Sequence, residues 1–282
     1  MCNAVSLILL AIVCADQPEA QKIGLAHNQN FIVTAPSQDL AQEVLKKADS
    51  LRKQIALDWL GEELPPNVGQ TSIQVKLSES EDEAHTWLID NPKRRLHLMW
   101  LTTSKEKALG ATLAHEIVHV VLATQFPGGL PTWAHEGAAC FQDDQERVKR
   151  RTRTIEWMAK TKNWPDLKKL LDASSIPAED HAAFCVASSL TEYLLEHGDK
   201  AKFLEFAFAS KTDGCGKALE RVYSIRSVAD LQTRWQDWVS ERSARKSNSP
   251  PAKIQQTKPA PKSSPGSDPK LGGNSAAVGS GN

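Results

Sequence analysis

Two hydrophobic periods alternate along the first half of the chain. Residues 31–35, 71–77 and 96–101 are short apolar or alternating runs, which predicts three strands. Between the first two runs, hydrophobic residues recur every three or four positions from residue 40 to residue 59, and Gly61 follows. This spacing predicts an amphipathic helix of about twenty residues that ends at the glycine.

The second half of the chain carries only the helical period. Thr103 and Glu106 have the spacing of a capping box, and the apolar positions behind them predict one helix that runs to about residue 124. A Pro-Gly-Gly break at 127–129 precedes a second helix that starts at Thr132, and helical patterns follow from there. Strands followed by helices predict an α+β fold, in which a small N-terminal sheet with helices precedes an all-helical C-terminal lobe.

The two ends of the chain differ in composition from the body. Residues 1–15 lack charged side chains and hold a run of about ten mostly apolar residues, which is too short to span a bilayer but typical of a signal peptide. We therefore expect export, to a secreted or periplasmic location, and no integral membrane span. A lipid anchor at Cys14 is disfavoured, because Val13 before it is bulkier than such sites need. Residues 243–282 are rich in Ser, Pro, Gly and Lys, which predicts a disordered basic tail.

Composition limits the classes of protein to which the chain can belong. Among 282 residues, 34 Lys and Arg balance 34 Asp and Glu, so the net charge gives no reason to expect a nucleic-acid partner. The body at 16–242 is long enough for two lobes, expected at about 28–125 and 130–242, and nothing in it fixes an oligomeric state. Its cysteines lack the C-x-x-C spacing of finger-type zinc sites and allow at most one internal disulfide, of open pairing: Cys140, Cys185 and Cys215.

The pattern H-E-x-x-H occurs once in the chain, at residues 115–119. A spacing of four places the imidazoles of His115 and His119 on one face of a helix, where both can bind the same metal ion. Glu116 then projects towards the open side of the ion and can take a proton from water that the metal has activated. The neighbouring residues are apolar, so this helix is expected to be buried, where unpaired polar groups are costly. A shared Zn²⁺ explains the three residues better than a pair of hydrogen-bonded core histidines.

Two histidines leave a catalytic zinc ion one protein ligand short. The next candidates are His135 and Glu136, beyond the Pro-Gly break. On a helix they project roughly 100° apart, so only one of them is expected to face the metal. Glu136 lies 17 residues after His119, which leaves room for a turn and an antiparallel second helix. A His₂Glu set with one zinc ion per chain is the favoured arrangement.

The segment around these residues resembles a known family. His115-Glu116-Ile117-Val118-His119, followed by Leu130-Pro131-Thr132-Trp133-Ala134-His135-Glu136-Gly137-Ala138, is similar to the two motifs of the gluzincin metallopeptidases, the thermolysin-like superfamily. The resemblance covers about 30 residues, and it implies a zincin-like fold and a peptide or protein substrate. It also implies zinc ligation by His115, His119 and Glu136, with Glu116 as the general base.

The chain departs from the family pattern at two positions. Family members usually carry a carboxylate one turn after the third ligand to orient an imidazole; Cys140 stands there, and Asp143 or Asp144 is a possible substitute. A tyrosine or histidine of the helical lobe often stabilises the oxyanion, but Phe184 stands at the expected position. Three residues could replace that donor, although each is more readily explained as structural: His181, Tyr193 and Tyr223.

Two functions of different classes follow from these features. The first is a secreted zinc-dependent metallopeptidase, in which an extended peptide lies along the 96–101 strand or the 71–77 strand. The alternative is a catalytically decayed zinc-binding or protein-interaction module on the same fold. We favour activity, because the ligands themselves matter more than the residues behind them. The basic cluster at 147–153 is interpreted as a solvated helix face, since acidic residues precede it, and His135 as a helix-surface residue.

Overall fold

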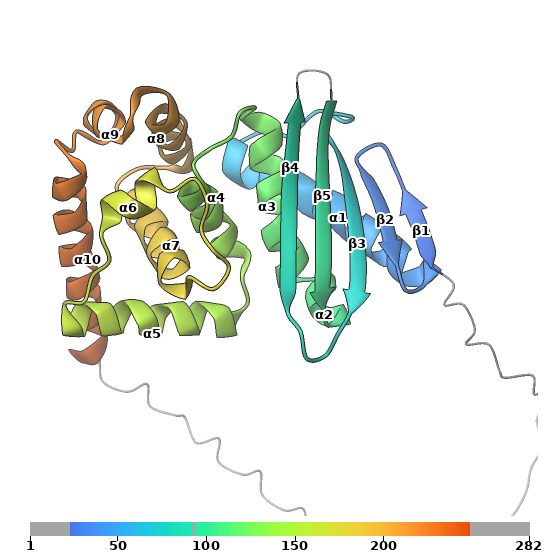
Figure 1. Cartoon of the computed structure of the whole chain (residues 1–282), viewed down its shortest axis with the longest axis horizontal. Helices are drawn as coiled ribbons and strands as arrows, with labels where there is room; N and C mark the ends of the chain where they lie inside the picture. Colours follow the sequence, from blue (N-terminus) through green and yellow to red (C-terminus); the bar gives the residue numbers. More distant parts are fainter. Residues whose placement is uncertain (1–22, 92–93, 249–282) are drawn as a thin grey trace, which may run out of the picture. The chain divides into compact units, whose positions relative to one another are not determined.

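A five-stranded mixed sheet forms the first part of the computed structural model, which describes residues 23–91 and 94–248 (Figure 1). The order across the sheet is β1-β2-β3-β5-β4. The parallel strands β2, β3 and β5 form the centre, and β1 and β4 pair with them in antiparallel fashion at the two edges. The strands are β1 (Gly24–His27), β2 (Phe31–Ala35), β3 (Gln70–Leu77), β4 (Glu83–Asn91) and β5 (Arg94–Thr103).

The predicted strands at 31–35, 71–77 and 96–101 are confirmed as β2, β3 and β5, whereas β1 and β4 were missed. Because β5 pairs with a strand on each side, neither it nor β3 is an edge at which a peptide could add, so that expectation was wrong. The edge strand next to β5 is β4, and β1 forms the opposite edge. The side chains of β4 gave little hydrophobic alternation, because the side facing the helices carries the small or polar Ala84 and Thr86, and Trp87 on the other side is 66% exposed.

Two long helices cover one face of the sheet. Helix α1 (Gln38–Leu60) packs against β1 and β2, and α3 (Ala111–Gln125) packs against β4 and β5. The two helices also contact each other, so they lie on the same face. Helix α1 confirms the predicted helix: the Ser37 hydroxyl accepts a hydrogen bond from the Leu40 amide at its start, and it ends at Gly61.

The single helix predicted from Thr103 to about residue 124 is two helices in the structure. Helix α2 (Lys105–Ala108) is capped by Ser104, whose hydroxyl accepts from the Lys107 amide, while Thr103 belongs to β5. The chain then leaves the helical conformation at Gly110, where φ is −134° and ψ is −122°. The prediction was wrong here because the apolar spacing continues through the break, whereas glycine is among the weakest helix formers.

Helices make up the rest of the described chain, which confirms the α+β class. Helix α10 runs six residues past the predicted start of the tail, because Ala244, Arg245 and Lys246 are good helix formers and the first proline comes only at Pro250. The predicted signal peptide at 1–15, with Cys14, and residues 249–282 of the tail lie outside the described residues. The elements are α4 (Thr132–Ala139), the 3₁₀ helix η1 (Cys140–Gln142), α5 (Gln145–Thr161), α6 (Leu167–Asp172), α7 (His181–Glu196), α8 (Lys200–Asp213), α9 (Cys215–Tyr223) and α10 (Val228–Asn248).

One hydrophobic core continues from the sheet through α3 and α4 into the later helices. Helix α4 packs closely on α7 at Gly137, where a Cβ atom would lie 2.0 Å from Thr191 Oγ1 and 2.8 Å from the Ala187 carbonyl oxygen. Only glycine permits this approach. The cysteines Cys140, Cys185 and Cys215 are free thiols. Within residues 23–91 and 94–248, every helix is too short or too polar to cross a membrane.

Candidate metal centre

Helix α3 presents two histidines on one face. His115 and His119 are separated by one helical turn, and their ring centroids lie 5.2 Å apart. The helix is buried almost throughout, with Leu113, Ile117 and Val118 fully inaccessible to solvent. Sheet, α1 and α4 surround it, so the imidazoles are held in a largely dry environment.

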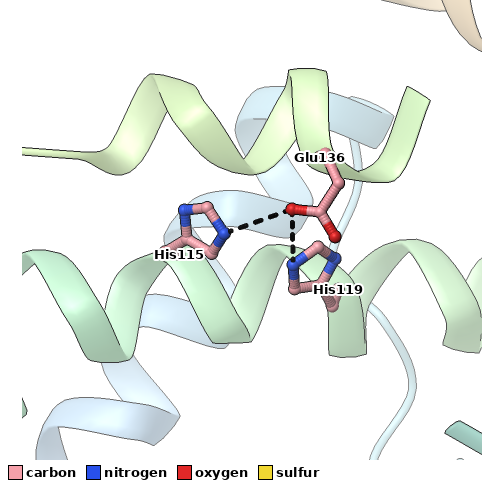
Figure 2. A group of neighbouring side chains, drawn as sticks. All are labelled: His115, His119 and Glu136. Atoms are coloured by element: carbon pink, nitrogen blue, oxygen red, sulfur yellow. Dashed lines mark ion pairs between the residues drawn. The ribbon is translucent and has the colours of Figure 1, made fainter. Parts of the chain in front are cut away.

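Glu136 reaches the histidines from α4. The chain turns back between the helices through Gly128 and Gly129, whose φ angles are 79° and 78°. Figure 2 shows the Glu136 carboxylate pointing down from α4 between the two rings. Its Oε2 lies 3.7 Å from His115 Nε2 and 3.8 Å from His119 Nε2. The two imidazoles lower the pKa of Glu136 despite its burial, so the group is a carboxylate.

The three side chains fit a metal ion. One donor atom from each lies within 4.8 Å of the other two. A tetrahedral zinc ion with bonds of about 2.0–2.1 Å holds its donor atoms roughly 3.4 Å apart, so contractions of a few tenths of an ångström bring Glu136 Oε2 into range. The remaining separation, between the donor nitrogens of His115 and His119, is at most 4.8 Å and closes with small rotations of the imidazole rings. The three residues predicted from sequence as the ligand set therefore converge, and their two nitrogens and one oxygen form a triad that could hold a metal ion.

A carboxylate behind His115 fixes the orientation of that ring. Asp143 Oδ1 lies 3.0 Å from His115 Nδ1, and the Asp143 side chain is only 2% exposed. A carboxylate can only accept, so Nδ1 carries a proton, and Nε2 is the nitrogen that would bind a metal after releasing its own proton. Burial opposes the charged imidazole, but the bonds to Asp143 and Glu136 outweigh it and raise the pKa of His115 to about 10. Asp143 thus fills the role for which Cys140 is unsuited, whereas Asp144 caps α5.

Glu116 has a partner that the sequence did not reveal. Thr86 Oγ1 donates a 2.6 Å hydrogen bond to Glu116 Oε2, and Glu116 is 4% exposed. Thr86 pairs with the fully buried Met99 in the sheet, so both side chains face α3. The only available signal was the position of Thr86 on β4, and that strand was not predicted. One oxygen of Glu116 is thereby held in place by β4.

The basic cluster is only partly a solvated surface, so that interpretation was wrong for two of its members. Arg150 and Arg153 are exposed, but the side chains of Arg147 and Arg151 are 20% and 16% exposed. Both bind Asp143. Despite its burial, Asp143 keeps a pKa well below its usual value, because His115 and the two guanidinium groups stabilise its charge.

His135 does not lie on a helix surface, contrary to expectation. It is 7% exposed, its ring centroid lies 5.7 Å from that of His119, and its Nδ1 lacks a partner among the described residues. Burial, followed by the nearby charge of His119, lowers the pKa of His135 to about 3. The ring is therefore neutral, and Glu136 rather than His135 joins the triad.

The residues considered as oxyanion donors have other contacts. The Tyr223 hydroxyl donates to the Leu194 carbonyl oxygen, and the Tyr193 ring packs on His197 and Trp238. Among the other two, His181 begins α7 and is exposed, and Phe184 is partly buried. The Tyr223 hydroxyl is thus already engaged by the backbone, whereas the contacts of Tyr193 involve its ring.

Comparison with known proteins adds no assignment. No protein-family model matches the chain, and no curated protein matches it at a significant level.

Proposed function

We propose that the chain is a zinc-dependent metallopeptidase of the gluzincin type, exported from the cell. One observation carries the proposal: His115, His119 and Glu136 have donor atoms within 4.8 Å of one another, and a hydrogen-bonded Glu116 lies on α3 next to His115. This is the minimum set for metal-assisted hydrolysis, with three ligands and one base. The export signal at residues 1–15 remains a sequence prediction.

The chain's own residues divide the work of peptide hydrolysis. Zinc bound by the triad would supply Lewis acidity, which lowers the pKa of water and polarises a carbonyl group. Glu116 takes the proton from the attacking water on its free oxygen and returns it to the leaving amine. Thr86 holds the other oxygen, so that the carboxylate keeps one orientation through both transfers. Asp143 keeps the proton of His115 on Nδ1.

The fold supports a peptide substrate. The edge strand β4 carries Thr86 and packs on α3, so its unpaired backbone groups run beside the triad-bearing helix. An extended peptide can add to such an edge through main-chain hydrogen bonds, which are independent of its sequence. A sheet edge above an H-E-x-x-H helix, followed by a second ligand-bearing helix, is the arrangement that a zincin-like fold requires.

One observation favours the alternative of a decayed, zinc-binding module. Tyr223 donates its hydroxyl to a backbone carbonyl, and Phe184, at the expected position, has no donor group, so neither can serve as the oxyanion donor. Against decay, Asp143 supplies the orienting carboxylate that Cys140 cannot. The two functions differ in a single measurable property, which is peptide hydrolysis that depends on Glu116.

The test combines metal content with cleavage of a mixed peptide library. The wild type should hold one zinc ion per chain and cleave the library. Glu136→Ala should lose most of the metal, whereas Glu116→Gln should keep it and lose hydrolysis. Equal zinc retention in Glu136→Ala would remove Glu136 from the ligand set. Equal cleavage by Glu116→Gln would exclude the proposed base, and no cleavage by any form would favour the decayed module.

A further inference from the structure

Two arginines of α5 enclose the carboxylate that orients His115. Arg151 Nη1 donates to Asp143 Oδ2, and Arg147 Nη1 donates to Oδ1 at 3.3 Å, the same oxygen that accepts from His115. Arg151 also donates through Nη2 to the Cys140 carbonyl oxygen at 3.0 Å, just after α4. Asp143 thus has a donor on each oxygen in addition to His115, and its position relative to the ring is fixed from both sides.

Arg147 and Arg151 form a clamp around Asp143, and this clamp is anchored to the sheet through Asp82, in the connection between β3 and β4. Arg147 Nη2 donates to Asp82 Oδ2 at 2.7 Å, and Lys107 Nζ donates to the same atom at 2.7 Å. The hydroxyls of Thr103, at the end of β5, and Thr112, in the first turn of α3, donate to Oδ1 at 2.8 and 3.2 Å. One carboxylate therefore joins the sheet, α2, α3 and α5.

We propose that Arg147 and Arg151 are positioning residues that hold Asp143, and through it the His115 imidazole, in the orientation that binds metal. The inference rests on the proposed metal site. Loss of either arginine leaves Asp143 free to rotate and unbalances its buried charge, so the imidazole must be ordered anew when the metal binds. Partners behind a ligand typically contribute about 10- to 100-fold to metal affinity. Lysine cannot replace Arg151, because an ammonium group does not span both Asp143 and the Cys140 carbonyl.

The experiment measures zinc affinity of the full chain by competition with a chromophoric chelator at fixed pH. Arg151→Met should weaken zinc binding by about 10- to 100-fold. Arg147→Met should weaken it less, because its contact with Asp143 is longer. The matched control is Arg150→Met, since Arg150 lies on the same helix and is exposed. Unfolding curves recorded in excess chelator separate loss of affinity from loss of the fold.

A rescue measurement tests positioning directly. Arg151 lines a cavity of about 400 Å³ between α5, α7 and α10, so a small guanidinium compound can reach the space that a truncated side chain leaves. Methylguanidinium, far below denaturing concentration, should restore at least part of the zinc affinity to Arg151→Ala and leave Arg150→Met unchanged. A general loss of stability would not respond to it.

Three results would overturn the inference. Zinc affinity of Arg151→Met within about two-fold of that of Arg150→Met would show that the clamp does not position His115. If Arg151→Met does not fold, an unchanged zinc affinity in Arg147→Met would likewise show that the clamp does not position His115. A wild-type protein that binds no zinc would remove the proposed function and this inference together, whereas zinc binding that ignores the arginines removes the inference alone.

Discussion

The close packing of α4 on α7 predicts that Gly137→Ala is destabilising, although alanine is the better helix former. At an unobstructed helical position this substitution stabilises by about 1 kcal/mol. Here the new methyl group would lie 2.0 Å from Thr191 Oγ1 and 2.8 Å from the Ala187 carbonyl oxygen. A side-chain rotation can relieve the first contact, but the second involves backbone, so the helices must move apart.

Forcing a methyl group into a packed interior typically costs about 1–3 kcal/mol, which exceeds the gain in helix propensity. Because Glu136 is the preceding residue, a shift of α4 also displaces its carboxylate relative to His115 and His119. We therefore expect zinc affinity to fall by roughly 10-fold or more, as happens when support behind a ligand is lost. Stability and metal affinity should change together.

Urea unfolding in excess chelator measures the first effect, and chelator competition measures the second. Gly216→Ala is the matched control, because Gly216 lies in α9 and a Cβ there would meet no atom within 4 Å. Thr191→Ala in the Gly137→Ala background should recover part of the lost stability, with a coupling of about 1 kcal/mol or more in the double-mutant cycle. A Gly137→Ala protein as stable as Gly216→Ala would refute the steric argument, whereas a coupling near zero would assign the cost to the backbone contact with Ala187.

Three further predictions follow from the site. Thr86→Val should lower kcat by about 10-fold or more with zinc affinity unchanged, because a hydrogen bond to a charged group contributes about 1.5–3 kcal/mol. Thr86→Ser keeps the hydroxyl and should retain most of the wild-type kcat. Equal rates in the two variants would exclude a role for the Thr86 hydroxyl in holding Glu116. Burial raises the pKa of Asp82, but Lys107, Thr103 and Arg147 outweigh it and lower that pKa to about 2. The ionised carboxylate should therefore contribute about 1–2 kcal/mol to the free energy of unfolding above pH 3.8, and this contribution should disappear as the pH falls to 2. In urea unfolding, Asp82→Asn should reduce the loss of unfolding free energy between pH 3.8 and pH 2. An unchanged loss would show that Asp82 is not its source. Zinc at 100 times its dissociation constant should stabilise the fold by about 2.7 kcal/mol, and no thermal shift would argue against the triad.

The convergence of His115, His119 and Glu136 could be predicted from sequence because local spacing determines it. His115 and His119 are one helical turn apart, and the Pro-Gly-Gly break before α4 made an antiparallel return to Glu136 the simplest path. The three central strands were found for the same reason, since burial on one or both faces produces a strong pattern. At Gly110, by contrast, apolar periodicity continued across a break that only the backbone geometry reveals.

The partners of the site were not accessible, because they depend on contacts between distant parts of the chain. Thr86 meets Glu116 only through the register of β4 against β5, and β4 has too weak a pattern to be recognised. Arg147 and Arg151 have the composition of a solvent-exposed helix, and their role follows from a carboxylate that α4 and η1 bring beside them. Sequence reasoning found Asp143 as one of two alternatives, and only the three-dimensional structure distinguishes it from Asp144.

The three triad residues and Thr86, the partner of Glu116, come from separate parts of the chain, and this has a consequence for how the site can change. The triad and Asp143 all come from residues 115–143, so little loop entropy is needed to bring them together. Thr86 arrives from a strand on the rim of the sheet, 30 residues before Glu116. If the proposed function holds, substitutions in that single strand would impair the base while the three ligand residues stay in place, so catalysis and metal binding could be lost independently.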